Sequence, residues 1–157
     1  MSELFYQMAA LLKTGGPRET VLAGALAAVL ADFHSETGTI HRLDDKTQLL
    51  KLVAQQGLPP QLLDVVGTIP VGKGIAGQVA AQNRPVTMCN LQTDTSGVAK
   101  PGARQTGVGG ALCVPMRLDG TLVGTLGVGT RREYEYTVEE TARLGEAGRL
   151  LAHLCGE

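Results

Sequence analysis

Hydrophobic residues recur at helical spacing near both ends of the chain. The first amphipathic stretch covers about residues 2–14 and predicts a helix with one apolar face. The second, over residues 17–33, is apolar nearly all round, so this helix should be largely buried. A last helix should begin after Thr137, because Glu140 stands three residues later and completes the spacing of a capping box. The chain is therefore expected to begin and end with helices.

Between these helices, β-rich runs separated by turn-forming residues predict two hairpins. The first pairs residues 37–43 with residues 48–54. The second pairs residues 111–118 with residues 121–129 around Asp119-Gly120, a dipeptide that favours a type I′ turn because both of its residues need a positive φ. Both faces of the second hairpin are mainly apolar, so we expect other elements to cover it on both sides.

The register of the second hairpin decides which residues share a face. A regular two-residue turn places Val114 opposite Thr125 and Leu112 opposite Gly127, with Met116 on the same side. We therefore expect these five residues to face one layer together.

The segment between the hairpins combines short elements with one long loop. One or two helical turns are expected over residues 61–66, an extended piece over 68–71, a brief helix over 75–82 and a short strand over 86–89. Residues 90–108 are polar and contain glycine and proline, so we expect them to form a loop. Loops of this length in compact domains are usually functional or mobile.

The segment Gly72-Lys73-Gly74-Ile75-Ala76-Gly77 matches the G-x-G-x-x-G pattern of dinucleotide-binding loops. A dinucleotide fold, however, requires a regular βαβ crossover at this point, whereas Pro70 precedes the motif and Pro85 ends the helix that follows. A simpler interpretation is that the glycines permit a tight turn and close helix packing. Anion binding at the start of this helix, with help from Lys73, stays open.

Composition limits the classes of partner. The chain has 157 residues, enough for one domain, and its 14 Lys+Arg against 15 Asp+Glu give a formal net charge of −1. This charge offers no attraction to nucleic acid or anionic lipid, and the longest apolar run, Val21–Ala31, is shorter than a membrane span. We expect no nucleic-acid partner and no membrane partner.

The three cysteines, Cys89, Cys113 and Cys155, are an odd number without Cys-x-x-Cys spacing. This pattern favours reduced thiols and a cytoplasmic location. The three histidines show no metal-ligand spacing, and no motif of a catalytic site is present, so we expect neither a metal site nor catalytic residues. Buried, inert thiols are the default interpretation of Cys89 and Cys113, and redox chemistry at this pair is the alternative.

Several segments, taken in order, resemble the GAF domain family over almost the whole chain. They are Ile69–Gly77, Arg84-Pro85-Val86, Ala111–Met116 and Leu122–Val128. The resemblance implies an α+β, profilin-like fold with a central antiparallel sheet of strand order 2-1-5-4-3. The N- and C-terminal helices would cover one face of the sheet. A small-molecule pocket would lie on the other face, under the short helix and the long loop.

The same resemblance implies a single domain over residues 1–157. Residues 1–34 would hold the N-terminal helices, residues 35–136 the sheet, short helix and lid loop, and residues 137–157 the C-terminal helix. Gly124 would let a helix approach closely, so we assign its face to the helix layer and the opposite face to the pocket. The expected ligand-binding residues are Gly74, Ile75, Met88, Asp94, Val108, Gly109, Leu112, Val114, Met116, Thr125 and Gly127.

GAF domains bind cyclic nucleotides, tetrapyrroles, haem or small metabolites, and some bind nothing, so the resemblance names no cofactor. The cyclic-nucleotide signature and a bilin-attachment motif are not apparent here. The leading hypothesis is a sensory or regulatory module in signal transduction, without enzymatic activity, that binds a small molecule or a signalling partner and acts on an output partner. It would form a homodimer through its terminal helices, with Leu144 and Leu151 at the interface.

Two alternatives come from other classes of protein. The first is a redox-active enzyme or thiol sensor related to the free methionine-(R)-sulfoxide reductases, which carry a similar Ile-Pro-Val-Gly-Lys-Gly segment. That branch has a cysteine where this chain has Ala76, and a catalytic cysteine in the loop before the second hairpin, where this chain has none between residues 90 and 112. The second alternative is a structural dimerisation module with a filled pocket.

Overall fold

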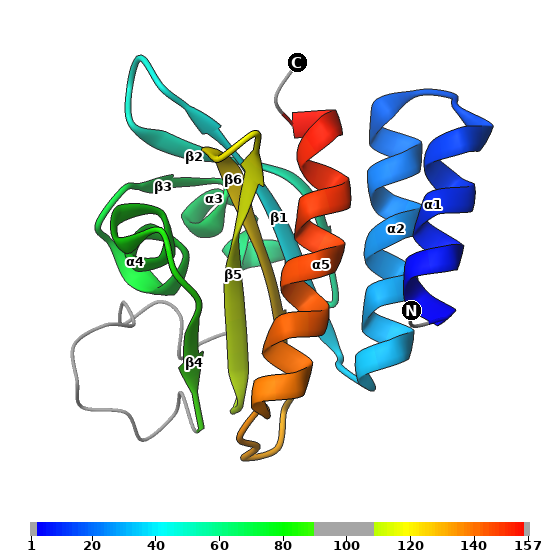
Figure 1. The fold of residues 1–157 in the computed structure, drawn as a ribbon. Helices are drawn as coiled ribbons and strands as arrows, with labels where there is room; N and C mark the ends of the chain where they lie inside the picture. The colour runs from blue at the N-terminus through cyan, green and yellow to red at the C-terminus, as the bar shows by residue number, and fades with distance from the viewer. Residues whose placement is uncertain (1–2, 90–108, 156–157) are drawn as a thin grey trace.

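The computed structural model describes residues 3–89 and 109–155. Its helices are α1 (Glu3–Thr14), α2 (Arg18–Phe33), the 3₁₀-helix Pro60–Leu62, α3 (Leu63–Val66), α4 (Gly74–Gln82) and α5 (Val138–Cys155). Its strands are β1 (Thr37–Asp44), β2 (Leu49–Gln56), β3 (Thr68–Pro70), β4 (Val86–Met88), β5 (Ala111–Leu118) and β6 (Thr121–Gly129). Helices α1, α2 and α5 lie on one side of the sheet and α3 and α4 on the other (Figure 1). The α+β class and the covering of both sheet faces agree with the sequence analysis.

The sheet has six strands in the order β3-β2-β1-β6-β5-β4, and every pair is antiparallel. It has one strand more than expected, because the extended piece after α3 pairs with β2 as an additional edge strand. Among the described strands no parallel crossover surrounds the Gly72–Gly77 motif, so the dinucleotide-binding interpretation is wrong.

The glycine motif instead builds a tight turn. Gly72 and Gly74 have φ values of +94° and +67°, which β-carbon-bearing residues rarely adopt. A β-carbon on Gly77 would lie 2.6 Å from the carbonyl oxygen of Pro70, so only glycine lets α4 pack this closely on the strand before it. The backbone N–H of Gly72 donates to the carbonyl of Gly77 at 2.8 Å and closes the turn.

The main hydrophobic core lies between the sheet and helices α1, α2 and α5. Its largest fully buried members include Leu22, Leu26, Ile40, Met116, Leu126, Leu144 and Leu151. The predicted burial of α2 is confirmed, since its apolar residues from Val21 to Phe33 dominate this cluster. In the part of the chain that the structure describes, no helix is long and apolar enough to cross a bilayer.

The capping box at the start of α5 is confirmed. The Glu140 N–H donates to Thr137 Oγ1 at 3.0 Å, and the Thr137 N–H donates to Glu140 Oε1 at 2.9 Å. Tyr134 also donates to Glu140 at 2.8 Å. Burial alone would raise the pKa of Glu140, but the hydrogen bonds from Thr137 and Tyr134 outweigh burial and hold it below its ordinary value.

The predicted turn of the second hairpin is also confirmed, with Asp119 at φ 52° and Gly120 at φ 82°. The predicted register fails beyond the turn, because a β-bulge between Met116 and Arg117 leaves one extra residue, Val123, in β6. Beyond the bulge, each β5 residue meets a β6 partner one position away from the expected one.

The bulge changes which side chains of β5 and β6 lie on the same face of the sheet. Val114 pairs with Leu126, and Leu112 pairs with Val128, where Thr125 and Gly127 were expected. Leu112, Val114 and Met116 accordingly join the helix-side core cluster. The assignment of Val114 and Met116 to the pocket face was wrong, because a one-residue slip moves alternating side chains to the opposite face.

Candidate functional site

A cavity of about 160 Å³ lies on the sheet face opposite α1, α2 and α5, and we call it the α4 cavity. The sheet contributes residues of β1, β5 and β6, and the segment from Leu58 to Ala76 covers them. The lining residues are Thr37, Gly38, Thr39, His41, Leu58, Val65, Val66, Ile69, Gly74, Ile75, Ala76, Ala111, Leu112, Cys113, Gly127, Val128 and Gly129. Among the described residues that line the cavity, none is Asp, Glu, Lys or Arg.

Small residues on β6 keep the floor of the α4 cavity open. A β-carbon on Gly127 would lie 3.2 Å from Thr39 Oγ1 and 3.6 Å from Cys113 Sγ, so it would enter the space between these two side chains. Glycine inside a strand often marks a place where a ligand or another backbone comes close.

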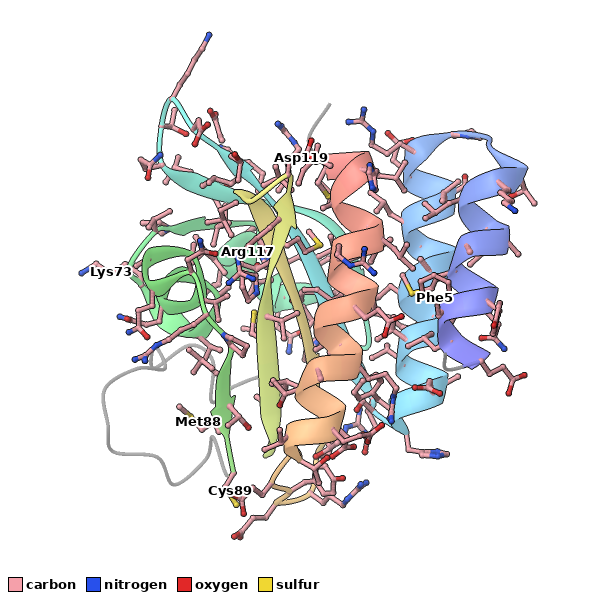
Figure 2. The ribbon with its side chains drawn as sticks, in the orientation of Figure 1. Phe5, Lys73, Met88, Cys89, Arg117 and Asp119 are labelled. Carbon is pink, nitrogen blue, oxygen red and sulfur yellow. The ribbon has the colours of Figure 1, made fainter. Side chains whose placement is uncertain are left out.

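The first turn of α4 forms one wall. Gly74, Ile75 and Ala76 line the cavity, and no side chain of residues 3–89 or 109–155 caps the helix. The first backbone N–H groups of a helix have no partner within it, so this wall offers hydrogen-bond donors and a weakly positive end of the helix dipole. The exposed side chain of Lys73 projects away from the body of the molecule (Figure 2), so the polar character of this wall comes from backbone groups.

His41 is the most polar side chain of the lining and is only 2% exposed. Its Nε2 lies 2.8 Å from the carbonyl oxygen of Val66. Because a carbonyl only accepts, Nε2 carries the proton and the ring ties α3 to the sheet. Burial lowers the pKa of His41, against a smaller opposing effect of the Val66 bond, so the ring is neutral at pH 7. Nδ1 is then a lone-pair acceptor, and it has no partner among the described residues.

Thr125 and Cys113 lie next to His41. Thr125 stands directly opposite His41 in the β1–β6 pair, is 1% exposed, and its hydroxyl faces the thiol of Cys113 without a regular hydrogen bond. Burial raises the pKa of Cys113 to about 12, so this thiol remains protonated at neutral pH.

The other two cysteines lie outside the α4 cavity. Cys89, at the end of β4 (Figure 2), is exposed and donates from Sγ to a carboxylate oxygen of Glu133 at 3.7 Å. Partial desolvation and the charge of Glu133 raise the pKa of Cys89. Burial raises the pKa of Cys155 to about 11. Residues 3–89 and 109–155 contain no group of three or more His, Cys, Asp and Glu placed to hold a metal ion.

The structure brings part of the predicted site together. Gly74, Ile75, Leu112 and Gly127 line the α4 cavity, and Leu112 also belongs to the helix-side cluster. Thr125 lies on the cavity side, opposite His41. Whether these residues bind a ligand stays a prediction.

Other predicted residues lie elsewhere. Val114 and Met116 pack in the helix-side core, and Met88 is buried in β4 outside the cavity lining. Gly109 also lies outside the lining, with its N–H donating to the carbonyl of Thr130. Asp94 and Val108, with the rest of the expected lid loop, lie outside the described residues.

His41 was missed by sequence reasoning, which considered histidines only as metal ligands. The available signal was the alternation Thr37, Thr39, His41 around the apolar Ile40, which places three polar residues on one face of a strand.

Comparison with solved structures finds the same fold in GAF domains of other proteins and in a methionine sulfoxide reductase. The GAF domain of a phosphoenolpyruvate-protein phosphotransferase from Coxiella burnetii has a TM-score of 0.83 at 18% identity, covering 98% of this chain and 91% of that one. Free methionine-R-sulfoxide reductase from Neisseria meningitidis, in complex with its substrate, has a TM-score of 0.82 at 19% identity, covering 98% and 87%. The nlh2 GAF domain of A. aeolicus has a TM-score of 0.76 at 17% identity, covering 96% and 92%.

At these identities the likeness shows a shared fold and does not separate a regulatory domain from an enzyme. Comparison with curated protein sequences gives no match. The family model for the GAF domain matches residues 17–154, from the start of α2 to the end of α5. This match spans most of the chain, and the chain belongs to the GAF domain family.

Proposed function

We propose that this chain is a sensory or regulatory module that binds a small molecule in the α4 cavity. The observation that carries the proposal is an apolar cavity of about 160 Å³ on one sheet face, while the opposite face is filled by the helix-side core. An apolar cavity of about 150 Å³ is large enough for benzene. Ligand sites are typically concave and mainly apolar with a few polar groups, so this cavity favours a role in binding.

Dimerisation through the terminal helices remains part of the proposal, with a changed interface. Leu144 and Leu151 are 0% exposed within one chain, because they hold α5 against the sheet, so they are not surface residues. The outer face of α2 instead exposes Ala23, Ala27 and Ala31 at four-residue spacing. Small residues in such a row permit close approach of a second helix. A charged substitution, Ala27→Arg, should convert the dimer to a monomer in light scattering, whereas Ala81→Arg, at an exposed alanine of α4 on the other side of the sheet, serves as the control.

The thiol-redox enzyme is the second candidate, since the fold is shared with a methionine sulfoxide reductase. Its chemistry requires a reactive thiolate. The buried Cys113 has a pKa raised to about 12, and Cys89 lies beside the carboxylate of Glu133, which opposes thiolate formation. These surroundings support a regulatory role ahead of the redox role.

The test is native mass spectrometry of the protein purified from its own host, followed by the same sample under denaturing conditions. We expect a small molecule that is retained natively and lost on denaturation. The variant Ala76→Leu adds bulk to the cavity wall and should lose this mass, whereas Ala81→Leu, at an exposed position of the same helix, should keep it.

Each other outcome favours an alternative. A clean ligand-free dimer would support the structural dimerisation module. Turnover of free methionine sulfoxide by the purified protein, lost in Cys89→Ser or Cys113→Ser, would establish the redox enzyme.

A further inference from the structure

A second hollow lies outside the α4 cavity, along the outer edge of β5. Strand β4 pairs only with residues Ala111–Cys113 of β5, and Pro85, just before β4, has no N–H group with which to continue the ladder. The rest of β5, Val114–Leu118, therefore has β6 on one side and no strand among the described residues on the other. We call the hollow of about 490 Å³ beside this edge the β5-edge groove.

Helix α5 and the turn between β5 and β6 form the walls of the β5-edge groove. Figure 1 shows α5 running along β5, and Figure 2 shows Asp119 at the turn and Arg117 between β5 and α4. The described lining residues are Pro85, Val114, Pro115, Arg117, Leu118, Asp119, Gly120, Gly145, Arg149 and His153. None of these residues also lines the α4 cavity, so the two hollows are separate. The volume lies within the roughly 300–1,000 Å³ of small-molecule sites.

Helix α5 presents two basic side chains to the groove. Gly145, Arg149 and His153 follow one another at four-residue spacing, so they share one face of the helix. Arg149 and His153 are exposed, and no described residue forms a hydrogen bond or an ion pair with either of them. Gly145 keeps the space beside them open, because a β-carbon there would meet nothing within 4 Å. The guanidinium of Arg149 is therefore available to a ligand.

Arg117 adds a third basic group, from the sheet. Its Nε donates to Oδ1 of Asn83 at 2.7 Å and its Nη2 donates to the Asn83 carbonyl, so the guanidinium is held in place at the end of α4. A guanidinium has five N–H donors, and those that do not bind Asn83 stay available. A side chain that is already held loses less entropy when a ligand binds. Asp119 is the only carboxylate of the described lining, so guanidinium groups outnumber carboxylates there.

We propose that the β5-edge groove binds a small organic anion, whose phosphate or carboxylate group is held by Arg149 with Arg117 and His153 beside it. Guanidinium groups form paired, charge-assisted hydrogen bonds with both kinds of anion. The carbon part of the ligand packs on Pro85 and Leu118 of the lining. This inference goes beyond the proposed function, because it adds a second binding site that the ligand of the α4 cavity does not occupy.

The test titrates the chain with three aromatic probes: phenyl phosphate, benzoate and the neutral phenol. NMR shifts of the backbone amides of Leu118 and Gly120 give the affinity for the groove itself, so that binding in the α4 cavity does not count. We expect the better of the two anions to bind at least about tenfold more tightly than phenol, as for one charge-assisted hydrogen bond. The tighter anion identifies the phosphate or the carboxylate as the group recognised. High salt should weaken its binding.

Two charge variants assign the effect to the groove. Arg149→Gln should weaken binding of the tighter anion by about tenfold, whereas Arg131→Gln, at an exposed arginine beyond the far end of β6, should leave it unchanged. Asp119→Asn removes the carboxylate of the lining and keeps a residue that suits the turn. This variant should tighten anion binding by about twofold, as expected for a charge several ångströms away in water.

A steric variant tests the same site without changing a charge. Gly145→Leu places a side chain in the open space of the groove and should abolish binding of the anion. It should also fold, because leucine favours a helix more than glycine does. The matched control is Ala10→Leu, at an exposed position of α1, which should bind as the wild-type chain does.

The outcomes that would overturn the inference are distinct from those that concern the proposed function. Equal affinity of phenol and the two anions, or failure of both anions to bind, would overturn it. An equal loss of binding in Arg131→Gln and Arg149→Gln would show a general effect of charge and no site. A clear loss of thermal stability in Arg149→Gln would show that this guanidinium is used within the chain. Ala76→Leu, which fills the α4 cavity, should leave binding in the groove unchanged.

Discussion

Two glycines of β6, three residues apart, should respond in opposite ways to the same substitution by alanine. Neither Gly124 nor Gly127 has a positive φ, so alanine is compatible with the backbone at both positions. Their surroundings differ. A β-carbon on Gly124 would collide with the backbone oxygen of His41 and lie 2.8 Å from Cε of Met116. A β-carbon on Gly127 would lie 3.2 and 3.6 Å from two side-chain atoms and 3.7 Å from the backbone oxygen of Leu112, which is an ordinary contact.

The magnitudes follow from these contacts. At Gly127, alanine restricts the unfolded chain, which stabilises by about 0.4–1 kcal/mol, and buries a methyl group worth about 0.8 kcal/mol. Part of this gain is offset because Thr39 must move by a few tenths of an ångström. We expect Gly127→Ala to raise the free energy of unfolding by about 1 kcal/mol. At Gly124 a strand must shift, and we expect a loss of about 3 kcal/mol, at the upper end of overpacking effects.

Urea denaturation of both variants and the wild-type chain, followed by circular dichroism, measures these differences. The slope m should be unchanged, so that the midpoint shift reports stability. Similar losses of stability in the two variants would refute the reasoning. Gly127 would then have no more room for a β-carbon than Gly124 has beside the backbone of His41. Gly127→Ala should also weaken binding of a ligand in the α4 cavity, since its methyl group would occupy part of that space.

Three further predictions concern titration, capping and thiol reactivity. Burial lowers the pKa of His41 below its ordinary value of 6.5, so below that pH the unfolded chain takes up a proton that the folded chain does not. The free energy of unfolding should therefore fall as the pH falls below 6.5, by up to about 1.4 kcal/mol per pH unit. In urea titrations at several pH values, His41→Gln should make this dependence on pH weaker. Thr137→Ala removes one half of the capping box and should lower stability by about 1 kcal/mol, which thermal unfolding can detect; an unchanged midpoint would contradict the role of the cap. Alkylation of the folded chain should modify Cys89 alone, with Cys113 and Cys155 reacting only in denaturant, as counted by mass spectrometry; early labelling of Cys113 would show that the cavity floor is open to reagent.

The elements that carry a strong local signal were predictable from the sequence. Helix α2 is apolar nearly all round, Asp119-Gly120 has the two positive φ values of its turn type, and Thr137 with Glu140 forms the capping box. In each case the residues that determine the structure are neighbours along the chain, so their pattern is visible in a single sequence.

The division of the strands between the two layers was not predictable in this way. No residue type marks Val123 as the extra residue of a bulge, yet that one residue places Leu112, Val114 and Met116 against the helices. Met116 then packs against Gly148 of α5, a contact between residues that are not neighbours along the chain.

The polar residues of the candidate site could not be predicted from the sequence, for a similar reason. The partner of His41 is the carbonyl of Val66, and its cross-strand neighbour is Thr125. These contacts exist only after the sheet and α3 have come together. A lone histidine in a strand gives no local sign that it will be buried with one free nitrogen.

The alternation of side chains in β1 and β5 has a consequence for the evolution of this domain. Ile40 and Val114 belong to the helix-side core, while their immediate neighbours His41 and Cys113 face the α4 cavity. Selection can therefore act on the two layers independently, because a substitution at a cavity position leaves the adjacent core residue in place. Drift at His41 and Cys113 is a route by which descendants of this chain could acquire new chemical preferences while inheriting the same helix packing.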